Sequence, residues 1–466
     1  MNIAFICNHF KTMFFYEVAL QLEKSGYKVF WLSPSKRWAN WLYSKGVPRN
    51  RILDITEYWK ERNGGNKSLT TNELQSLFSL EEYSGIRIND VILMDRLLSK
   101  KHIEYALLYL STCNKHITNF ISTNNIKVVF SEATWAFELI TIMICKKLKL
   151  NCYCPHTIRI PDGRFAFFEG HNQAKFEQIR KVTEEDIKLA EAYYDMFLTK
   201  KPKPKYWYIN NKIPKFRLDW INKMISHIIM KVKGINHFDE TYFGTRYLIQ
   251  KRIQEVCNAK LISILNPFEK PPRERPYVLF TLHKQPEASI DVLGSMYSNQ
   301  LETIKKIIRR LPVTHELYVK EHSNSIGDRS LNFYNNIKSL PNVKLIDPYV
   351  DSHELIKGAD LVITISGTIA YEAALYGVPA ITLADMFFKP ILANNNVDLS
   401  SINIQEIREN LKSFRREKII EFLAYMYANS FEGEVSDPKT SPSCVSNENI
   451  AKVTRGFHKV LSNQLS

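Results

Sequence analysis

The sequence predicts an α/β protein made of two domains, each with a parallel β-sheet covered by helices. Short β-branched, apolar runs alternate with helical segments in both halves of the chain, which is the pattern of βαβ units. The length of 466 residues also exceeds what one hydrophobic core usually serves. Four prolines within residues 266–276 remove backbone donors, so we expect this segment to link the two domains.

The first domain, residues 1–265, opens with a strand, a helix that ends at Gly26, and a second strand. A second such unit follows, and the segment 60–100 between the two is polar and irregular. Residues 172–260 indicate a helical insertion interrupted by a Lys/Pro-rich run. The elements expected in order are strands 3–7, 28–32, 127–130 and 152–154, with helices at 14–24, 101–124 and about 135–148.

The second domain, residues 277–446, repeats the alternation, so we expect a parallel sheet with helices on both faces. A final helix is expected over 447–466. The predicted strands are 277–281, 316–320, 343–346, 361–365 and 378–382, with helices at 299–310, 330–340 and from near 368 to 377.

The turn after the apolar strand 361–365 carries the strongest functional signal. It lies at the carboxyl end of a parallel strand, where open α/β sheets bind ligands, and the following helix points unpaired N–H groups at an anion. Gly367 permits close backbone approach, and the hydroxyls of Ser366 and Thr368 can bond a phosphate. Glu372 lies one helical turn further on, within reach of ribose hydroxyls. Taken alone, the simpler alternative is that Ser366 and Thr368 only cap a helix.

Polar residues follow two further strands of the second domain. Lys320 and His322 end the strand 316–320 and can neutralise a phosphate. Gln285 and Glu287 follow the strand 277–281 and can present an amide and a carboxylate to a base or a sugar. Each pair alone is also compatible with ordinary surface charges in a loop. Three strand ends that carry polar groups to one edge predict a shared ligand site.

The run Ser366-Gly-Thr followed by residues 371–379, together with the segments around Gln285 and Lys320, resembles the donor site of GT-B glycosyltransferases. The resemblance is greatest to the bacterial capsule polysaccharide biosynthesis family that includes Kdo transferases, and it covers about residues 277–383. It implies two Rossmann-like domains that face a cleft, with the nucleotide-sugar bound by the second domain and the acceptor by the first. It also implies a terminal helix that crosses back to the first domain. The family usually has proline after the histidine, where this chain has Ser323.

The first domain offers candidates for proton transfer and acceptor binding. Glycosyl transfer needs a carboxylate or an imidazole to take the acceptor hydroxyl's proton, or a carboxylate to form a covalent sugar adduct. Glu132, after strand 127–130, is the leading candidate, and His156 is the second. Arg159 and Arg164, in a polar loop, can grip an anionic acceptor or a sugar carboxylate. Carboxylates at sheet rims and arginines in loops are also common where no ligand binds.

The formal charge of +15 favours an anionic partner, which could be nucleic acid, a membrane surface or a charged substrate. The basic run that begins at Lys200 leads into an amphipathic helix over 218–233, which suits an anionic inner membrane. The simpler alternative is that this helix packs on its own domain. We find no nucleic-acid-binding motif and expect no nucleic acid partner.

Neither a metal nor a cofactor is expected. The sequence contains no Asp-x-Asp motif after a strand and no His/Glu pair at ligand spacing, so we expect no metal site. The N-terminus reads directly as a strand and lacks the features of a signal peptide, which predicts a cytoplasmic protein that contacts the membrane peripherally.

These observations predict a metal-independent glycosyltransferase that builds bacterial capsule or lipopolysaccharide glycans. The resemblance implies a CMP-Kdo-like donor and a glycan or glycolipid acceptor. The alternatives are a transferase that uses a UDP-hexose, a sugar-nucleotide 2-epimerase of the same fold, and a non-catalytic scaffold of the capsule machinery. An epimerase would release a free epimer from the donor alone, whereas a scaffold would bind no nucleotide.

Overall fold

The computed structural model describes residues 1–65, 68–200, 218–234, 237–392 and 416–464, with Leu399 and Asn403. The chain forms two compact α/β units, as predicted. The first unit contains Met1–Ile179, Ile221–Thr245 and Asn429–Ser466, and the second contains Arg180–Trp220 and Arg246–Ala428.

The domain boundary differs from the predicted proline-rich linker at 266–276, which lies within the second unit. Helix α11 (Thr245–Leu265) buries Ala259 and Ile262 in the core of that unit. Glu269, in the proline-rich segment itself, forms a β-bridge with Ile346. The proline-rich segment therefore lies along an edge of the second unit. Proline lacks a backbone N–H group, but the residues between the prolines can still form β-bridges.

The first unit is built on a seven-stranded sheet with the order β12-β6-β5-β4-β1-β2-β3. Its centre is parallel, but β5 and β6 form an antiparallel hairpin in which His156 pairs with Ala166. Strand β5 is longer than the predicted strand 152–154 and includes His156, and Arg164, predicted in a loop, begins β6. The strands are β1 (Asn2–Ile6), β2 (Lys28–Ser33), β3 (Ile52–Asp54), β4 (Ile126–Phe130), β5 (Asn151–Thr157), β6 (Arg164–Glu169) and β12 (Phe431–Glu432).

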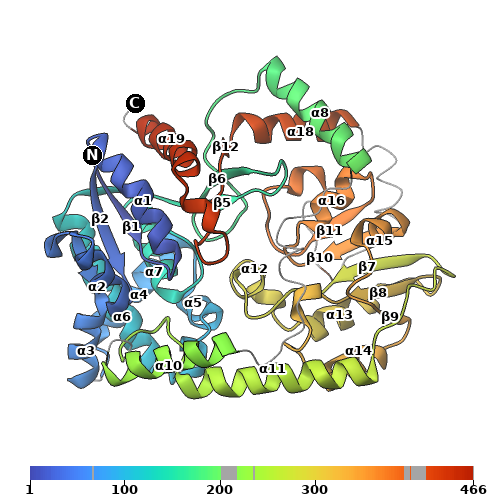
Figure 1. Cartoon of the computed structure of the whole chain (residues 1–466), viewed down its shortest axis with the longest axis horizontal. Helices are drawn as coiled ribbons and strands as arrows, with labels where there is room; N and C mark the ends of the chain where they lie inside the picture. The colour runs from blue at the N-terminus through green and yellow to red at the C-terminus, as the bar shows by residue number, and fades with distance from the viewer. Residues whose placement is uncertain are drawn as a thin grey trace. The chain divides into compact units, whose positions relative to one another are not determined.

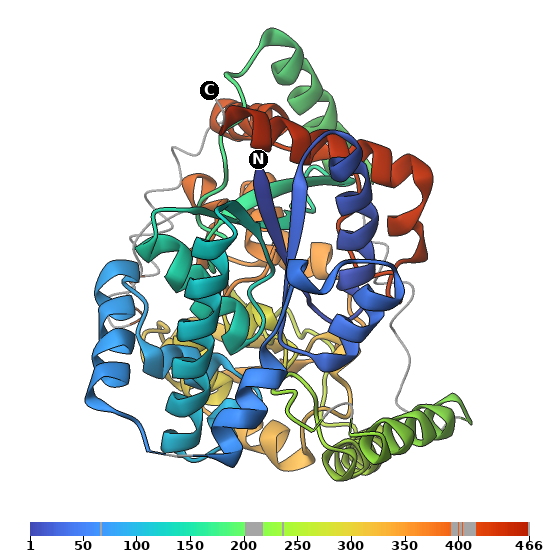
Figure 2. The same cartoon turned by 90° about the vertical axis from the view of Figure 1, so that its left-hand side faces the viewer.

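Helices cover this sheet, and the terminal helix is one of them. Helix α19 (Asn447–Asn463) lies beside α1 (Lys11–Lys24), as both cartoon views show (Figures 1 and 2). Its Phe457 ring lies 4.7 Å from that of Phe130 and 5.9 Å from that of Phe5, all three fully buried. The last helix therefore completes the core of the unit in which the chain begins.

The segment 60–100 is largely helical, contrary to the prediction. Helices α3 (Ile55–Gly64), α4 (Thr71–Ser84) and α5 (Ile88–Met94) occupy it. Thr70 and Glu73 form a capping box at the start of α4, and Gly85 ends it in the left-handed conformation. The remaining helices of the unit are α2 (Lys36–Ser44), α6 (Ile103–Thr123), α7 (Ala136–Lys147) and α10 (Leu218–Val232).

The second unit has a five-stranded, fully parallel sheet with the order β11-β10-β7-β8-β9. Strands β10, β7 and β8 are consecutive, so the three strand ends predicted to share a ligand lie side by side (Figure 1). The strands are β7 (Tyr277–Thr281), β8 (Glu316–Lys320), β9 (Val343–Ile346), β10 (Leu361–Thr364) and β11 (Ala380–Thr382). The helices are α8 (Glu184–Lys200), α11, α12 (Ala288–Asp291), α13 (Gln300–Ile308), α14 (Leu331–Lys338), α15 (Ser352–Gly358), α16 (Ile369–Leu375) and α18 (Arg416–Ala428).

Candidate functional site

The candidate ligand edge of the second unit is formed by the carboxyl ends of β7, β8 and β10. Thr281, the last residue of β7, is in register with Lys320, the last of β8. On the other side of β7, the Thr281 hydroxyl donates to the Thr364 hydroxyl at the end of β10, at 3.1 Å. The loops that follow the three strands therefore begin at one level.

The backbone of the turn after β10 lies close to neighbouring side chains. A Cβ at Gly367 would lie 2.7 Å from the Thr364 hydroxyl oxygen, so only glycine fits without a shift. The Ser366 hydroxyl donates to the Ser289 carbonyl at 2.6 Å. Thr368 is the N-cap of α16, yet its side chain makes no capping hydrogen bond. Helix capping therefore does not explain the two hydroxyls of this turn.

Glu372 lies on the first full turn of α16. Its N–H donates to the Thr368 carbonyl at 3.0 Å, so its side chain projects from the same face of the helix as the turn. The residue is half-buried and belongs to the helix that begins at the ligand edge.

His283, directly after β7, is a residue whose role the sequence analysis missed. Its Nε2 atom lies 2.9 Å from the Thr364 hydroxyl oxygen and accepts the Ser366 N–H at 3.4 Å. Its own backbone N–H and carbonyl are held by the Gln300 side chain at 2.7 and 3.0 Å. Burial is the main cause that lowers the pKa of His283 to about 3, and the positive charge of Arg329 adds to it. The ring is therefore neutral and braces the turn after β10.

Gln285 and Glu287, the predicted ligand groups after β7, form hydrogen bonds with nearby residues of the chain. The Gln285 amide donates to the Ser298 carbonyl at 3.1 Å, and its oxygen accepts from Gln300 at 2.9 Å. Glu287 is exposed and accepts the Ser289 hydroxyl at 3.0 Å. Of this pair, Glu287 is the one whose carboxylate stands at the surface.

Lys320 and His322 differ in how they are placed. The Lys320 side chain is buried, and its ammonium donates to the Pro348 carbonyl at 2.8 Å, which ties it to the loop after β9. His322 accepts the Asn324 N–H through Nδ1 at 3.2 Å, so its neutral ring carries the hydrogen on Nε2. His322 is therefore the better phosphate donor of the two.

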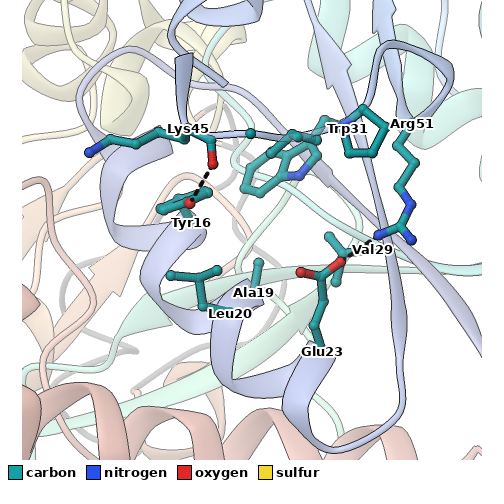
Figure 3. A pocket seen from close by; sticks show the side chains of 11 residues that line it. Tyr16, Ala19, Leu20, Glu23, Val29, Trp31, Lys45 and Arg51 are labelled. Carbon is teal, nitrogen blue, oxygen red and sulfur yellow. Dashed lines mark hydrogen bonds and ion pairs between the residues drawn. The ribbon is translucent and has the colours of Figure 1, made fainter. Parts of the chain in front are cut away.

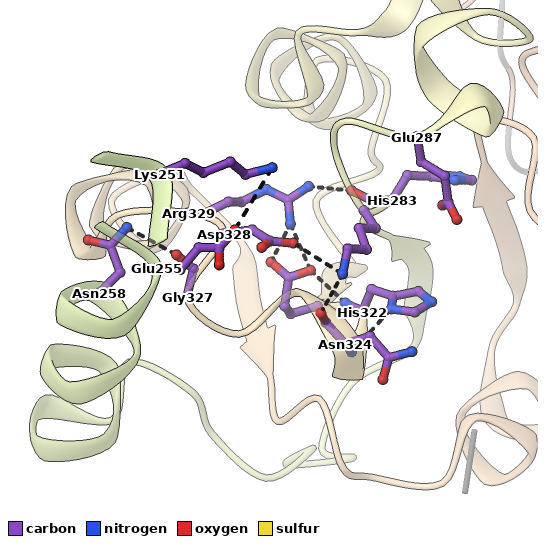
Figure 4. A network of polar contacts seen from close by, with 12 residues as sticks. Lys251, Glu255, Asn258, His283, Glu287, His322, Asn324, Gly327, Asp328 and Arg329 are labelled. Carbon is purple, nitrogen blue, oxygen red and sulfur yellow. Dashed lines mark hydrogen bonds and ion pairs between the residues drawn. The ribbon is translucent and has the colours of Figure 1, made fainter. Parts of the chain in front are cut away.

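A buried polar network supports the loop after β8 (Figure 4). The Arg329 guanidinium binds both carboxylate oxygens of Glu321, at 2.8 and 2.7 Å, and also donates to the His283 carbonyl. The Tyr334 hydroxyl donates to the same carboxylate at 2.9 Å. Next to it, the Lys284 ammonium lies 3.9 Å from Asp328, whose pKa burial raises to about 6. The network therefore connects the loop after β7 to the loop after β8.

In the first unit, Glu132 lies at the carboxyl end of β4 and forms an ion pair with Lys11, the first residue of α1. The buried Glu138 carboxylate accepts the Asn8 amide at 2.6 Å and the Thr134 N–H at 2.6 Å. Burial, followed by the charge of Glu132, raises the pKa of Glu138 to about 8. The loops after β1 and β4 are thus joined around Glu132.

His156, on β5, feels the charges of the same Lys11–Glu132 pair. Its Nδ1 donates to the Thr157 carbonyl at 2.9 Å, which leaves Nε2 as an acceptor. Burial, followed by the charge of Lys11, lowers the pKa of His156 to about 4. The neutral imidazole is thus available as a base.

The two predicted arginines have different surroundings. Arg164 donates to the hydroxyl and the carbonyl of Ser430, at 2.8 and 2.6 Å, and so anchors β12 to β6. Because these bonds occupy the Arg164 guanidinium, they do not favour its predicted role in binding an anionic ligand. Arg159 is exposed in the hairpin between β5 and β6, with a left-handed φ of 64°.

A separate hollow lies between α1 and β2 (Figure 3). It is lined by apolar atoms of Ala19, Leu20 and Val29, and the Glu23–Arg51 ion pair, at 2.7 Å, closes one side. The hollow lies near the amino end of β2, away from the carboxyl ends that hold Glu132 and His156. Within the described ranges, no group of three or more His, Cys, Asp or Glu side chains could hold a metal ion.

Part of the chain is similar in sequence to UDP-N-acetylglucosamine 2-epimerases. Residues 250–429 match the sequence pattern of the UDP-N-acetylglucosamine 2-epimerase family, so the match includes the whole ligand edge of the second unit. The UDP-N-acetylglucosamine 2-epimerase of Methanocaldococcus jannaschii is 30% identical over 24% of this chain, and the matched part spans 31% of that relative.

Two solved structures are similar at low identity. One is the UDP-GlcNAc 2-epimerase from Methanocaldococcus jannaschii, with 14% identity, a TM-score of 0.24, and coverage of 98% of this chain and 99% of that one. The other is the KpsC β-Kdo 2,7-transferase of Thermosulfurimonas dismutans, with 11% identity, a TM-score of 0.33, and coverage of 74% and 89%. These low scores add nothing to the fold that the strand order itself defines.

Proposed function

We propose that the protein is a glycosyltransferase whose nucleotide-sugar donor binds at the ligand edge of the second unit. The observation that carries this proposal is the convergence of three strand ends, which brings the Gly367 turn, His322 and Glu372 to one side of a parallel sheet. The match of residues 250–429 to a sugar-nucleotide enzyme family supports this choice of ligand.

In this proposal each group at the edge has a role in holding the donor. The backbone of the Gly367 turn lies against the phosphates, because the absence of a Cβ permits the approach. His322 donates to a phosphate oxygen through Nε2, and Glu372 accepts from the ribose hydroxyls. Negative charge that develops on the leaving nucleotide is stabilised by these fixed donors.

Glu132 is the group that we propose accepts the proton of the acceptor hydroxyl. The acceptor oxygen attacks the anomeric carbon, the bond from that carbon to the phosphate oxygen breaks, and the proton passes to the carboxylate. The ion pair with Lys11 holds the carboxylate in place. His156, neutral and with Nε2 as an acceptor, is the second candidate for the same step.

The resemblance of the donor segments to Kdo transferases favours a CMP-activated 3-deoxy sugar, and a UDP-sugar is the alternative. A sugar-nucleotide 2-epimerase is the second candidate function, because the family match itself is to such enzymes. Incubation of the protein with CMP-Kdo or UDP-GlcNAc, followed by NMR of the products, separates the two. Epimerisation of UDP-GlcNAc without any acceptor would contradict the transferase proposal.

We further propose a peripheral contact with anionic membrane through residues 200–233. Of these, 201–217 lie outside the described residues. Helix α10 exposes Ile225, Ile228 and Ile229 by about half and Val232 by 82%. None of the helices in the described ranges is long and apolar enough to cross a membrane. Flotation with anionic vesicles tests the contact, which Ile225→Asp with Ile229→Asp should abolish.

A further inference from the structure

The side-chain amide of Asn8, just after β1, is held on one side only. Its Nδ2 atom donates to the Thr134 hydroxyl oxygen at 2.7 Å and to the Glu138 carboxylate at 2.6 Å. These two bonds use both hydrogens of the amide, and both partners follow β4 in the chain. Because Oδ1 lies on the other side of the amide carbon, it faces away from Thr134 and Glu138.

The neighbours of the amide decide which of its two ends is the nitrogen. The Glu138 carboxylate also accepts the Thr134 hydroxyl at 2.8 Å, the Thr134 N–H at 2.6 Å and the Trp135 N–H at 3.2 Å. Since the Thr134 hydroxyl gives its hydrogen to Glu138, it meets Asn8 with a lone pair. An Asn8 oxygen in this position would face two acceptors, so the nitrogen takes it and the oxygen is left outside.

Asn8 lies at the same sheet edge as the proposed base, Glu132. Strands β1 and β4 are paired in parallel, and Asn8 and Glu132 each come two positions after the end of their strand. Two contacts then join the loops that follow these strands. Asn8 donates to Thr134, which is two positions beyond Glu132. Lys11, which is three positions beyond Asn8, forms the ion pair with Glu132.

The Asn8 oxygen has no partner among the residues that the structure describes. Both hydrogen bonds of the Asn8 side chain there are donated by Nδ2. The residue is buried, with 8% exposure, but Oδ1 is not one of the fully enclosed oxygens that lack a partner in the described ranges. A molecule at the sheet edge can therefore reach this oxygen, and a donor on that molecule would satisfy it.

We propose that Asn8 binds the acceptor sugar by accepting a hydrogen bond from a second hydroxyl of the ring whose first hydroxyl loses its proton to Glu132. An oxygen that only accepts repels phosphate and carboxylate groups, whereas a sugar hydroxyl can donate to it. An acceptor without this hydroxyl is rejected, because the Asn8 oxygen then loses its partner. This inference rests on the proposed transferase function.

The test uses the full chain, CMP-Kdo or UDP-GlcNAc as donor, and the methyl glycosides of glucose, galactose, N-acetylglucosamine and Kdo as acceptors. Asn8→Ala is compared with Asn2→Ala, the matched control. Asn2 begins the same strand, and its amide donates to the Asn124 carbonyl at 2.7 Å. The assays are run above the pKa of Glu138, which burial raises to about 8, so that its carboxylate accepts from Asn8.

Asn8→Ala should raise the acceptor KM about tenfold and leave nucleotide affinity unchanged, because it removes one hydrogen bond to the acceptor alone. Asn2→Ala should behave as the unaltered protein does. In the unaltered protein, one monodeoxy acceptor that keeps the reacting hydroxyl should show a similar rise in KM, and Asn8→Ala should abolish the difference. Equal acceptor KM in the two variants would overturn the assignment. So would the lack of any such deoxy effect in the unaltered protein, or a deoxy effect that persists in Asn8→Ala.

Failure of the transferase proposal gives a different result. If the unaltered protein transfers sugar to none of these glycosides, their binding is measured by saturation-transfer NMR. Binding that Asn8→Ala abolishes and Asn2→Ala preserves would support the sugar site without the transfer reaction. Binding of no glycoside, or binding that Asn8→Ala leaves unchanged, would overturn the site.

Discussion

Arg329 binds both carboxylate oxygens of Glu321, at 2.8 and 2.7 Å, and this buried pair ties the loops after β7 and β8 together. Both side chains are nearly inaccessible, at 9% and 0% exposure. A buried carboxylate that loses its cation is an uncompensated charge, so removal of one partner costs far more than the pair contributes in total.

We therefore predict that Arg329→Met lowers the free energy of unfolding by about 3–5 kcal/mol. The double variant Arg329→Met with Glu321→Leu should be more stable than Arg329→Met alone, because the orphaned charge is gone. Urea denaturation followed by fluorescence measures both. Equal stability of the single variant and the unaltered protein would contradict the buried-pair account.

Gly367→Ala should weaken nucleotide binding, because the added Cβ would lie 2.7 Å from the Thr364 hydroxyl and 3.4 Å from His283. Gly64→Ala is the matched control, since nothing lies within 4 Å of a Cβ there. Thr364→Ala combined with Gly367→Ala removes the clashing oxygen and should restore part of the affinity. Nucleotide titration by calorimetry compares the three. A Gly367→Ala variant that binds as well as the control would exclude a close approach of ligand to this turn.

Much of this edge could be predicted from the sequence, and the reason is local. Strands such as 277–281 and 316–320 match the structure residue for residue, because short apolar runs bounded by polar loops have few alternatives. The rule for the carboxyl ends of parallel strands then brings Gly367 and His322 together. The sequence does not predict the direction of a side chain. Lys320 is predicted to bind a phosphate, but its ammonium donates to the Pro348 carbonyl.

Other parts depend on contacts between distant residues. The role of His283 follows from Thr364, 81 positions away, and the orientation of Arg164 follows from Ser430, 266 positions away. Neither pairing leaves a mark in local sequence. Helix α4 is different, because Thr70 and Glu73 have the spacing of a capping box, which is a local sequence signal for the start of a helix. The polar composition of the segment favoured an irregular structure instead.

Glu132→Gln should lower kcat for sugar transfer by about 100-fold or more, since general base catalysis contributes roughly that much. Nucleotide affinity should stay unchanged, because Glu132 belongs to the first unit and the proposed donor site to the second. Glu169→Gln, at the exposed end of β6, is the matched control. Loss of nucleotide binding in Glu132→Gln would show that the residue acts on the donor and not on the acceptor.

Stability should fall as the pH drops from about 6.5 to about 4. The pKa of His156 is lowered from 6.5 to about 4 in the folded protein, so over this range the unfolded chain binds the proton and the folded protein does not. The stabilisation is fully present above pH 6.5 and lost near pH 4. His156→Asn should reduce this loss by up to about 3 kcal/mol. His102→Asn, an exposed position, is the control, and urea denaturation at several pH values gives the slopes. Equal slopes for His156→Asn and the unaltered protein would contradict the placement of a neutral, half-buried imidazole.

The most direct test of the central claim is a thermal-shift titration of the full chain with CMP, UDP, GDP and dTDP. We predict that one of them, CMP or UDP, raises the melting temperature, and that Glu372→Ala weakens this binding about tenfold through loss of charged hydrogen bonds to the ribose. Glu417→Ala, at an exposed position in the first turn of α18, should bind normally. No stabilisation by any of the four nucleotides, or equal affinity in Glu372→Ala, would contradict a nucleotide-sugar site at the carboxyl edge of the second unit.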